Sequence, residues 1–175
     1  VDYLSLPARA LTPMLLKIPM QGRNDEAKST LENWDYQLDS NSKAAAFYAA
    51  FERALEELAH EKLVPKEVQP FIQRINLIKI IDWLNDPNSE TFGSDPETAR
   101  TTLLTQAFQQ GVNSLAQQLG PDMTRWQYGQ AKLKHTFLEH SLSKLVDKKT
   151  QKLLNLGPLP RGGNAYTPGS TGSDY

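Results

Sequence analysis

The feature that most constrains this fold is one long amphipathic stretch, residues 42–62. Its large apolar side chains recur every three or four residues, which places them on one face of an α-helix. Ser42 is a typical N-cap residue, and Pro65 ends the pattern. The apolar stripe consists of Phe47, Phe51, Leu55 and Leu58, and three alanines at 44–46 allow a neighbour to approach closely. We expect the charged residues of this helix to face water: Glu52, Arg53, Glu56, Glu57 and Glu61.

Helical periodicity also covers most of the remaining chain. The run Asp95-Pro96-Glu97 combines an N-cap, a proline in the first turn and an acid near the positive end of the helix dipole. The helix that it starts is predicted to extend to about Leu119. Its apolar stripe is Leu104, Phe108, Val112, Leu115 and Leu119.

Shorter helices are predicted on either side of these two. Residues 26–36 form one with Leu31 and Trp34, residues 67–85 form one whose apolar face holds Phe71, Ile75 and Ile78, and residues 146–155 form a last turn or two. Pro7 and Pro13 predict a broken helix over residues 3–18. No segment is convincing as a strand.

The sequence therefore predicts an all-α arrangement of about five or six helices over residues 1–156. Residues 157–175 hold a cluster of glycines and prolines without apolar periodicity, and an irregular tail is predicted there. A chain of 175 residues is long enough for one domain with a core. Because it begins with Val1 rather than methionine, we expect an excised or processed piece.

Composition excludes several classes of protein. The chain has 19 basic and 20 acidic residues, so it lacks the basic excess typical of nucleic-acid binding. It has no cysteine, which excludes disulfides and cysteine-ligated metals. No apolar run reaches the length of a membrane span, and no signal peptide is visible.

No group of residues in the sequence indicates a catalytic centre. His135 and His140 are five apart, whereas a helical metal pair needs a spacing of four, and Glu139 adds only a second ligand to His135. The Gly162-Gly163 pair has no phosphate-loop pattern around it, and no G-x-S-x-G motif is present. We assign no catalytic, cofactor-binding or metal-ligating residue. The tryptophans, at 34, 83 and 126, are predicted to be buried anchors.

The stretch "NWDYQLDSNSKAAAFYAAFERALEELA" nevertheless resembles the penicillin acylase (penicillin amidase) family. The resemblance lies in a Trp-Asp pair, a Ser-x-Ala-Ala passage and an aromatic residue soon after. In this chain these are Trp34, Asp35, Ser42, Ala44, Ala45, Tyr48 and Phe51.

Three further segments resemble the family, in the right order. "DYLSLPARALTPMLL" has the Asp-x-x-Ser-x-x-Ala pattern at Asp2, Ser5 and Ala8, followed by Pro13. A long helix is followed by a Trp-x-aromatic-Gly motif at Trp126, Tyr128 and Gly129; the family's histidine normally comes soon after, whereas this chain has Lys132 and then His135. "GPLPRGGNAYTPGSTGSDY" resembles the approach to a later strand of the family.

The resemblance implies an N-terminal-nucleophile hydrolase with an αββα architecture, of which this chain is an internal helical segment of the large chain. It implies a serine nucleophile that removes the acyl group from penicillins or N-acyl homoserine lactones. It places the nucleophile, the oxyanion asparagine and any calcium ligands outside this chain, so the segment itself is expected to be inactive. The expected partners are the catalytic sheets and the small chain, or a second copy, and the expected location is periplasmic or secreted.

One alternative remains open at this stage. The chain is compatible with a stand-alone helical module that binds a partner in a groove between helices. A longer reading frame, with a serine-headed chain upstream and strands downstream, would favour the hydrolase. A frame that ends at Tyr175 would favour the module.

Overall fold

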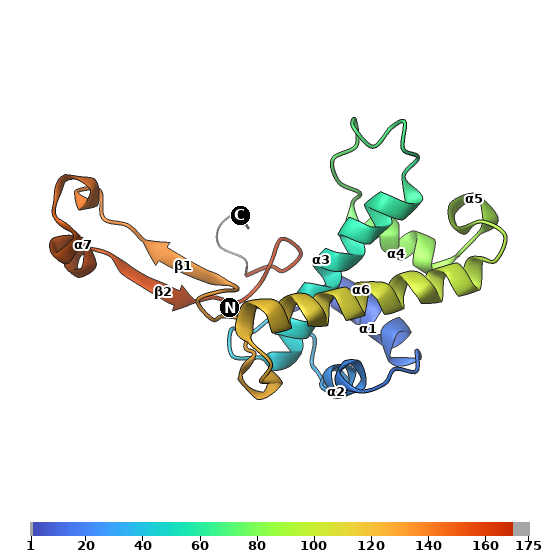
Figure 1. The fold of residues 1–175 in the computed structure, drawn as a ribbon, viewed down its shortest axis with the longest axis horizontal. Coiled ribbons are helices and arrows are strands. Elements are labelled where there is room, and N and C mark those ends of the chain that lie inside the picture. The colour runs from blue at the N-terminus through green and yellow to red at the C-terminus, as the bar shows by residue number, and fades with distance from the viewer. Residues whose placement is uncertain (1, 170–175) are drawn as a thin grey trace.

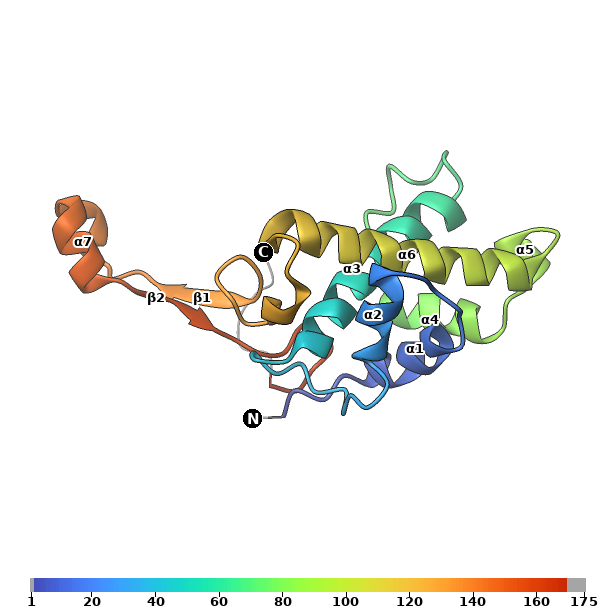
Figure 2. The same ribbon diagram turned by 60° about the horizontal axis from the view of Figure 1, so that its bottom comes forward.

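The computed structural model describes residues 2–169, and in them the chain is mainly helical, as predicted. Helices α3 (Lys43–Leu63) and α6 (Pro96–Leu119) are the two longest and cross each other in the middle of the molecule (Figures 1 and 2). Around them lie α1 (Leu6–Leu16), α2 (Arg23–Ser29), α4 (Leu77–Asn85) and the short α5 (Ser89–Phe92). No helix among the described residues is both long enough and apolar enough to cross a membrane.

The two long helices agree with their predicted starts and apolar faces. Ser42 Oγ accepts a hydrogen bond from the Ala45 N–H at 3.1 Å, and an oxygen of Asp95 accepts one from the Thr98 N–H at 3.2 Å. These side chains satisfy N–H groups that a helix start leaves without partners. Both stripes are buried except Leu119, which is half-buried, and Phe51 of α3 packs edge to face on Phe108 of α6.

The short helices differ more from the sequence predictions. Residues 6–16 form one continuous helix rather than a broken one: Pro7 lies at its start and needs no N–H partner, while Pro13 lies on the exposed face. Helix α2 ends at Ser29, so Leu31 and Trp34 are buried in the turns that follow it. The apolar side chains, rather than helix continuity, determine what is buried there.

The predicted helix at 67–85 is wrong over its first half. Asn76 caps α4, which begins only at Leu77, and residues 65–75 form turns. Phe71 is therefore on the surface, with 85% of its area exposed. The face that α4 buries consists of Leu77, Ile80, Ile81 and Leu84, whereas the predicted Ile78 is exposed. Trp83 is only half-buried, and the Lys79 ammonium lies 5.5 Å from its ring centroid.

A two-stranded antiparallel sheet is the main departure from an all-helical chain. Strand β1 (His135–Leu138) pairs with β2 (Leu156–Pro160), and α7 (Lys148–Leu154) lies in the connection between them. Two single-turn 3-10 helices complete the fold, η1 (Met123–Arg125) and η2 (Ser143–Leu145). The prediction that the chain has no strand is therefore wrong, and β2 occupies the beginning of the region predicted to be irregular. Residues 134–161, which we call the arm, project away from the helices (Figure 1).

The crossing of α3 and α6 depends on one glycine. A Cβ atom built on Gly111 would lie 2.8 Å from the Ala50 carbonyl carbon and 2.8 Å from the Phe51 nitrogen. Backbone atoms cannot rotate away as a side chain can, so any larger residue must separate the helices.

Gly111→Ala tests this contact. Alanine favours a helix over glycine by about 1 kcal/mol, but overpacking of a filled interface costs about 1–3 kcal/mol. We expect overpacking to dominate, and the urea midpoint of Gly111→Ala to fall. Gln109→Ala, an exposed position on the same helix, is the matched control and should leave the midpoint nearly unchanged. A Gly111→Ala variant as stable as the unmutated chain would contradict the close crossing of the two helices.

Candidate functional site

The segments that carry the family resemblance come together at the start of α3. The Tyr128 N–H donates to the Ser42 carbonyl at 3.1 Å, and the Gly129 N–H donates to the Ser40 carbonyl at 2.6 Å. The Gly163 N–H donates to the Leu38 carbonyl at 2.9 Å. Three segments far apart in the sequence are thus joined through backbone hydrogen bonds, and we call this region the joint (residues 34–42, 126–129 and 162–167).

Two glycines in the joint are required by close approach. A Cβ atom on Gly129 would lie 2.4 Å from the Ser40 Cβ atom. A Cβ atom on Gly162 would lie 2.6 Å from Cε2 of Tyr3 and 2.7 Å from the Leu38 carbonyl oxygen. Only a residue without a side chain fits either position. The glycine of the Trp-x-aromatic-Gly motif is therefore explained by packing.

The stretch "NWDYQLD" turns sharply between α2 and α3. Tyr36 has a positive φ of 63°, a conformation that few residues other than glycine adopt. This turn lets the Tyr36 carbonyl accept from the Ser5 N–H at 3.0 Å and the Leu38 N–H donate to the Tyr3 carbonyl at 3.0 Å. The Trp34 indole N–H donates to the Gln37 carbonyl at 3.0 Å, and its ring packs on Tyr48, with 5.3 Å between centroids. The stretch connects α3 to the beginning of the chain.

Beneath the joint lies a buried carboxyl group that the sequence analysis placed in water. Glu52 is only 7% exposed, so the prediction for this residue is wrong. The Asn164 side-chain amide donates to Glu52 Oε1 at 2.8 Å, and one turn further along α3 the Tyr166 hydroxyl donates to Glu56 Oε1 at 3.0 Å. Residues 162–167 thus cover a face of α3 that helical periodicity alone marks as polar and exposed.

Burial determines the electrostatics of this cluster. Loss of water is the main cause that raises the pKa of Glu52, and the nearby charge of Glu56 raises it too. The Tyr48 hydroxyl and the Asn164 amide lower it, and the net pKa is about 8. Burial likewise raises the pKa of Glu56, and burial together with the neighbouring acids raises the pKa of Tyr166 to about 12. At neutral pH, Glu52 is therefore mainly a neutral carboxylic acid.

A buried acid with such a pKa is typical of general acid–base catalysis, but it can also have a purely structural role. The surroundings of Glu52 distinguish these two roles. Glu52 Oε2 and the hydroxyl of Tyr48, one turn before it on α3, are both buried and make no hydrogen bond of ordinary geometry within residues 2–169, but the two groups lie close enough for each to shift the pKa of the other. Asn164 and Thr167, both buried, lie over this face, and the Tyr128 hydroxyl donates to the Gly163 carbonyl at 2.8 Å. The carboxyl is closed off from solvent, which favours a structural role in holding residues 162–167.

Ser5 and the three histidines are engaged in local contacts. Ser5 is buried, and its Oγ caps α1 by accepting from the Ala8 N–H at 3.2 Å. Ring nitrogens of His60 and His135 contact the carbonyls of Ile72 and Leu133, and that of His140 accepts from the Leu142 N–H. Within residues 2–169, no group of three or more acids and histidines is placed to hold a metal ion.

Two surface hollows lie elsewhere on the helices. One lies between α3, α5 and α6, and is lined by Lys62, Phe92 and Leu103 among others. The second lies between α1, α4 and α6, and is lined by Met14, Ile18 and Leu84 among others. Neither contains the Glu52 cluster, so the joint and these hollows are separate features.

The raised pKa of Glu52 predicts how stability depends on pH. The folded chain retains the Glu52 proton up to about pH 8, whereas the unfolded chain loses it near pH 4.5. The contribution of Glu52 to the free energy of unfolding is fully present below pH 4.5 and is lost as the pH rises to about 8. At about 1.4 kcal/mol per pKa unit, the loss amounts to up to about 5 kcal/mol. Glu52→Gln should flatten the free energy of unfolding across this window. Glu57→Gln, at an exposed position, is the matched control and should keep the pH dependence of the unmutated chain. If the free energy of unfolding of Glu52→Gln falls with pH as steeply as that of the unmutated chain, the raised pKa is not that of Glu52.

Comparison with known proteins identifies the family of this chain. A search of curated protein sequences finds no match. The model of the penicillin amidase family matches residues 1–175, the whole sequence. The segments that carried the resemblance are those that the joint brings together, and this chain belongs to the penicillin amidase family.

Proposed function

We propose that this chain is the mainly helical, non-catalytic part of the large chain of an N-terminal-nucleophile amide hydrolase. The parent enzyme releases the acyl group from N-acyl compounds such as penicillins or N-acyl homoserine lactones. The observation that carries the proposal is the family match over residues 1–175. The parent's nucleophilic serine, its oxyanion asparagine and any calcium ligands lie outside this chain, and the parent functions in the periplasm or outside the cell.

The positions of the hydroxyl groups support a non-catalytic role. Nucleophilic catalysis needs a hydroxyl that substrate can reach and a base within hydrogen-bonding distance. Ser5, the serine of the family-like first segment, is buried as the cap of α1, and Ser42 caps α3. The joint uses its polar side chains to position backbone, so its contribution to the parent is to hold the helices and the arm in place.

The exposed apolar side chains support packing against further protein. Phe71, in the turns before α4, is 85% exposed, and Leu145 and Leu153 of the arm are 79% and 81% exposed. Phe71 lies apart from the arm, but the arm also exposes Phe137, Leu142 and Leu156, and apolar groups gathered in one segment typically mark an interaction surface. The remainder of the parent hydrolase is the partner that we propose for them, and self-association is the alternative for the separate chain.

Activity measurements test the proposal directly. The 175-residue chain and the product of the extended reading frame are incubated with a chromogenic phenylacetyl amide. We expect turnover by the longer product, a newly formed N-terminal serine in its mass spectrum, and no turnover by the 175-residue chain. Turnover by the 175-residue chain alone would refute its non-catalytic role, and a reading frame that ends at Tyr175 would refute the larger enzyme.

A further inference from the structure

The arm is an isolated two-stranded sheet. Its strands pair with each other, and the first ladder bond at its base joins the Arg161 N–H to the Lys134 carbonyl at 3.2 Å. In both views the arm extends away from the helices (Figures 1 and 2). A two-stranded sheet without a packed face is marginally stable in water. The arm therefore gains stability from any element that covers or extends it.

The two outer edges of this sheet are not equivalent. Alternate residues of an antiparallel strand point their N–H and C=O groups toward the partner strand and away from it. Because Arg161 and Leu159 point inward, Pro160 points outward. The register shifts between Thr136 and Leu138, which leaves Gly157 and Pro158 opposite Phe137, and Pro158 has no N–H to donate in any orientation. Proline has no N–H, and prolines on an edge discourage the addition of another strand. The outer edge of β2 is thus closed to strand pairing.

The outer edge of β1 has no such protection. By the same alternation Thr136 points inward toward Leu159, and the backbone N–H and C=O of His135 point outward. The strand reads His-Thr-Phe-Leu, with neither proline nor lysine, and its Phe137 side chain is 54% exposed. An edge with free backbone groups beside an exposed aromatic side chain is a template for strand addition.

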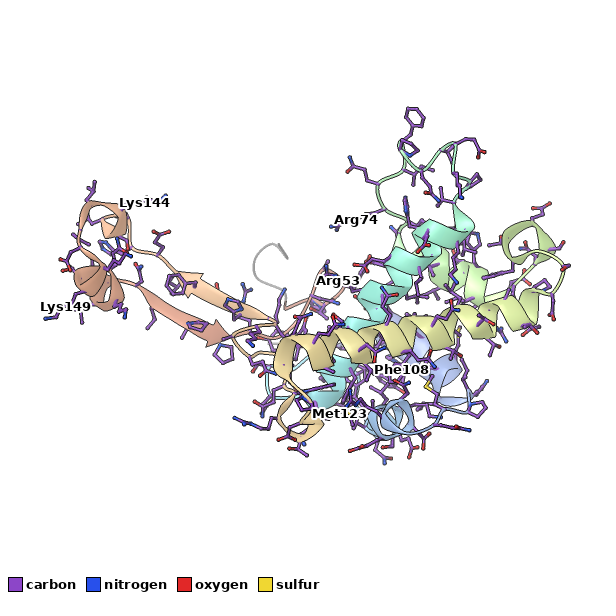
Figure 3. All side chains as sticks on the ribbon, in the orientation of Figure 1. Arg53, Arg74, Phe108, Met123, Lys144 and Lys149 are labelled. Carbon is purple, nitrogen blue, oxygen red and sulfur yellow. The ribbon has the colours of Figure 1, made fainter. Side chains whose placement is uncertain are left out.

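Charge limits what can pair there. The arm contains six basic and two acidic residues of the chain's 19 and 20, so it is net positive by four while the rest of the chain is net negative by five. Lys144 and Lys149 lie at its far end (Figure 3). Pairing of two arms from two copies would bring like charges together, which is unfavourable. An extended segment with acidic side chains is attracted instead.

We propose that the β1 edge of the arm binds an extended protein segment of alternating apolar and acidic residues, which adds as a third strand beside His135–Leu138. Backbone hydrogen bonds to His135 supply the pairing, Phe137 supplies apolar contact, and the lysines of the arm attract the acidic side chains. The inference concerns the arm alone and holds whatever reaction the parent catalyses.

A labelled peptide of alternating valine and glutamate is the probe, added to the whole 175-residue chain. We expect saturable binding by fluorescence anisotropy, and at least tenfold slower hydrogen exchange of the His135 amide on binding. The valine–lysine peptide, and a valine–glutamate peptide with proline at alternate valines, should bind at least tenfold more weakly. Equal binding of the proline peptide would show charge attraction without strand pairing, and would overturn the proposal.

Two matched variants separate the edge from the general charge of the arm. Phe137→Asp places an acid beside the β1 edge, and Leu153→Asp places one on α7, also in the arm and exposed. We expect Phe137→Asp to weaken binding at least tenfold and Leu153→Asp to weaken it less than threefold. Equal losses, an unchanged His135 amide, or pairing of two copies through β1 in light scattering would each overturn the proposal.

Discussion

The burial of the Glu52 carboxyl beneath residues 162–167 is the interaction on which the joint depends. An ionised carboxylate in this position would lose its hydration without a cationic partner in contact, so the fold keeps the group protonated instead. The protonated Glu52 still accepts a hydrogen bond from the Asn164 amide. One turn along α3, Glu56 likewise accepts a hydrogen bond from the Tyr166 hydroxyl. Residues 162–167 are thereby attached to a helix about 110 residues earlier in the sequence.

This arrangement explains why the family is recognisable from short motifs in this chain, because packing fixes their residues. Gly129 is fixed by its approach to Ser40, Gly162 by its approach to Tyr3 and Leu38, and Trp34 by its ring contact with Tyr48. Each requirement is one of shape. Residues with such requirements of shape identify the family.

Sequence reasoning succeeded where local signals decide the structure. Caps and apolar spacing located α3 and α6 because Ser42, Asp95 and their stripes act within a few residues. It failed at Glu52 because an exposed-looking helical position becomes buried only through contact with residues 110 positions away. It missed β1 and β2 because strands of four and five residues give little periodicity, and β2 also contains two prolines. It misplaced Phe71 because the local cap at Asn76, which starts α4 only at Leu77, was overlooked.

Both ends of the arm are attached to the joint. Tyr128 and Gly129 bind the start of α3 shortly before β1 begins, and Gly163 and Asn164 bind it shortly after β2 ends. Both ends of the arm therefore leave the body from the same anchored region, so the direction of β1 is set by contacts around Ser40, Leu38 and Glu52. Release of Asn164 from Glu52 would leave the second end still held by Gly163, through Leu38 and Tyr128. The contacts of this buried acid with residues 162–167 thereby help to set the direction of the arm, and with it the position of the β1 edge for which we propose strand pairing.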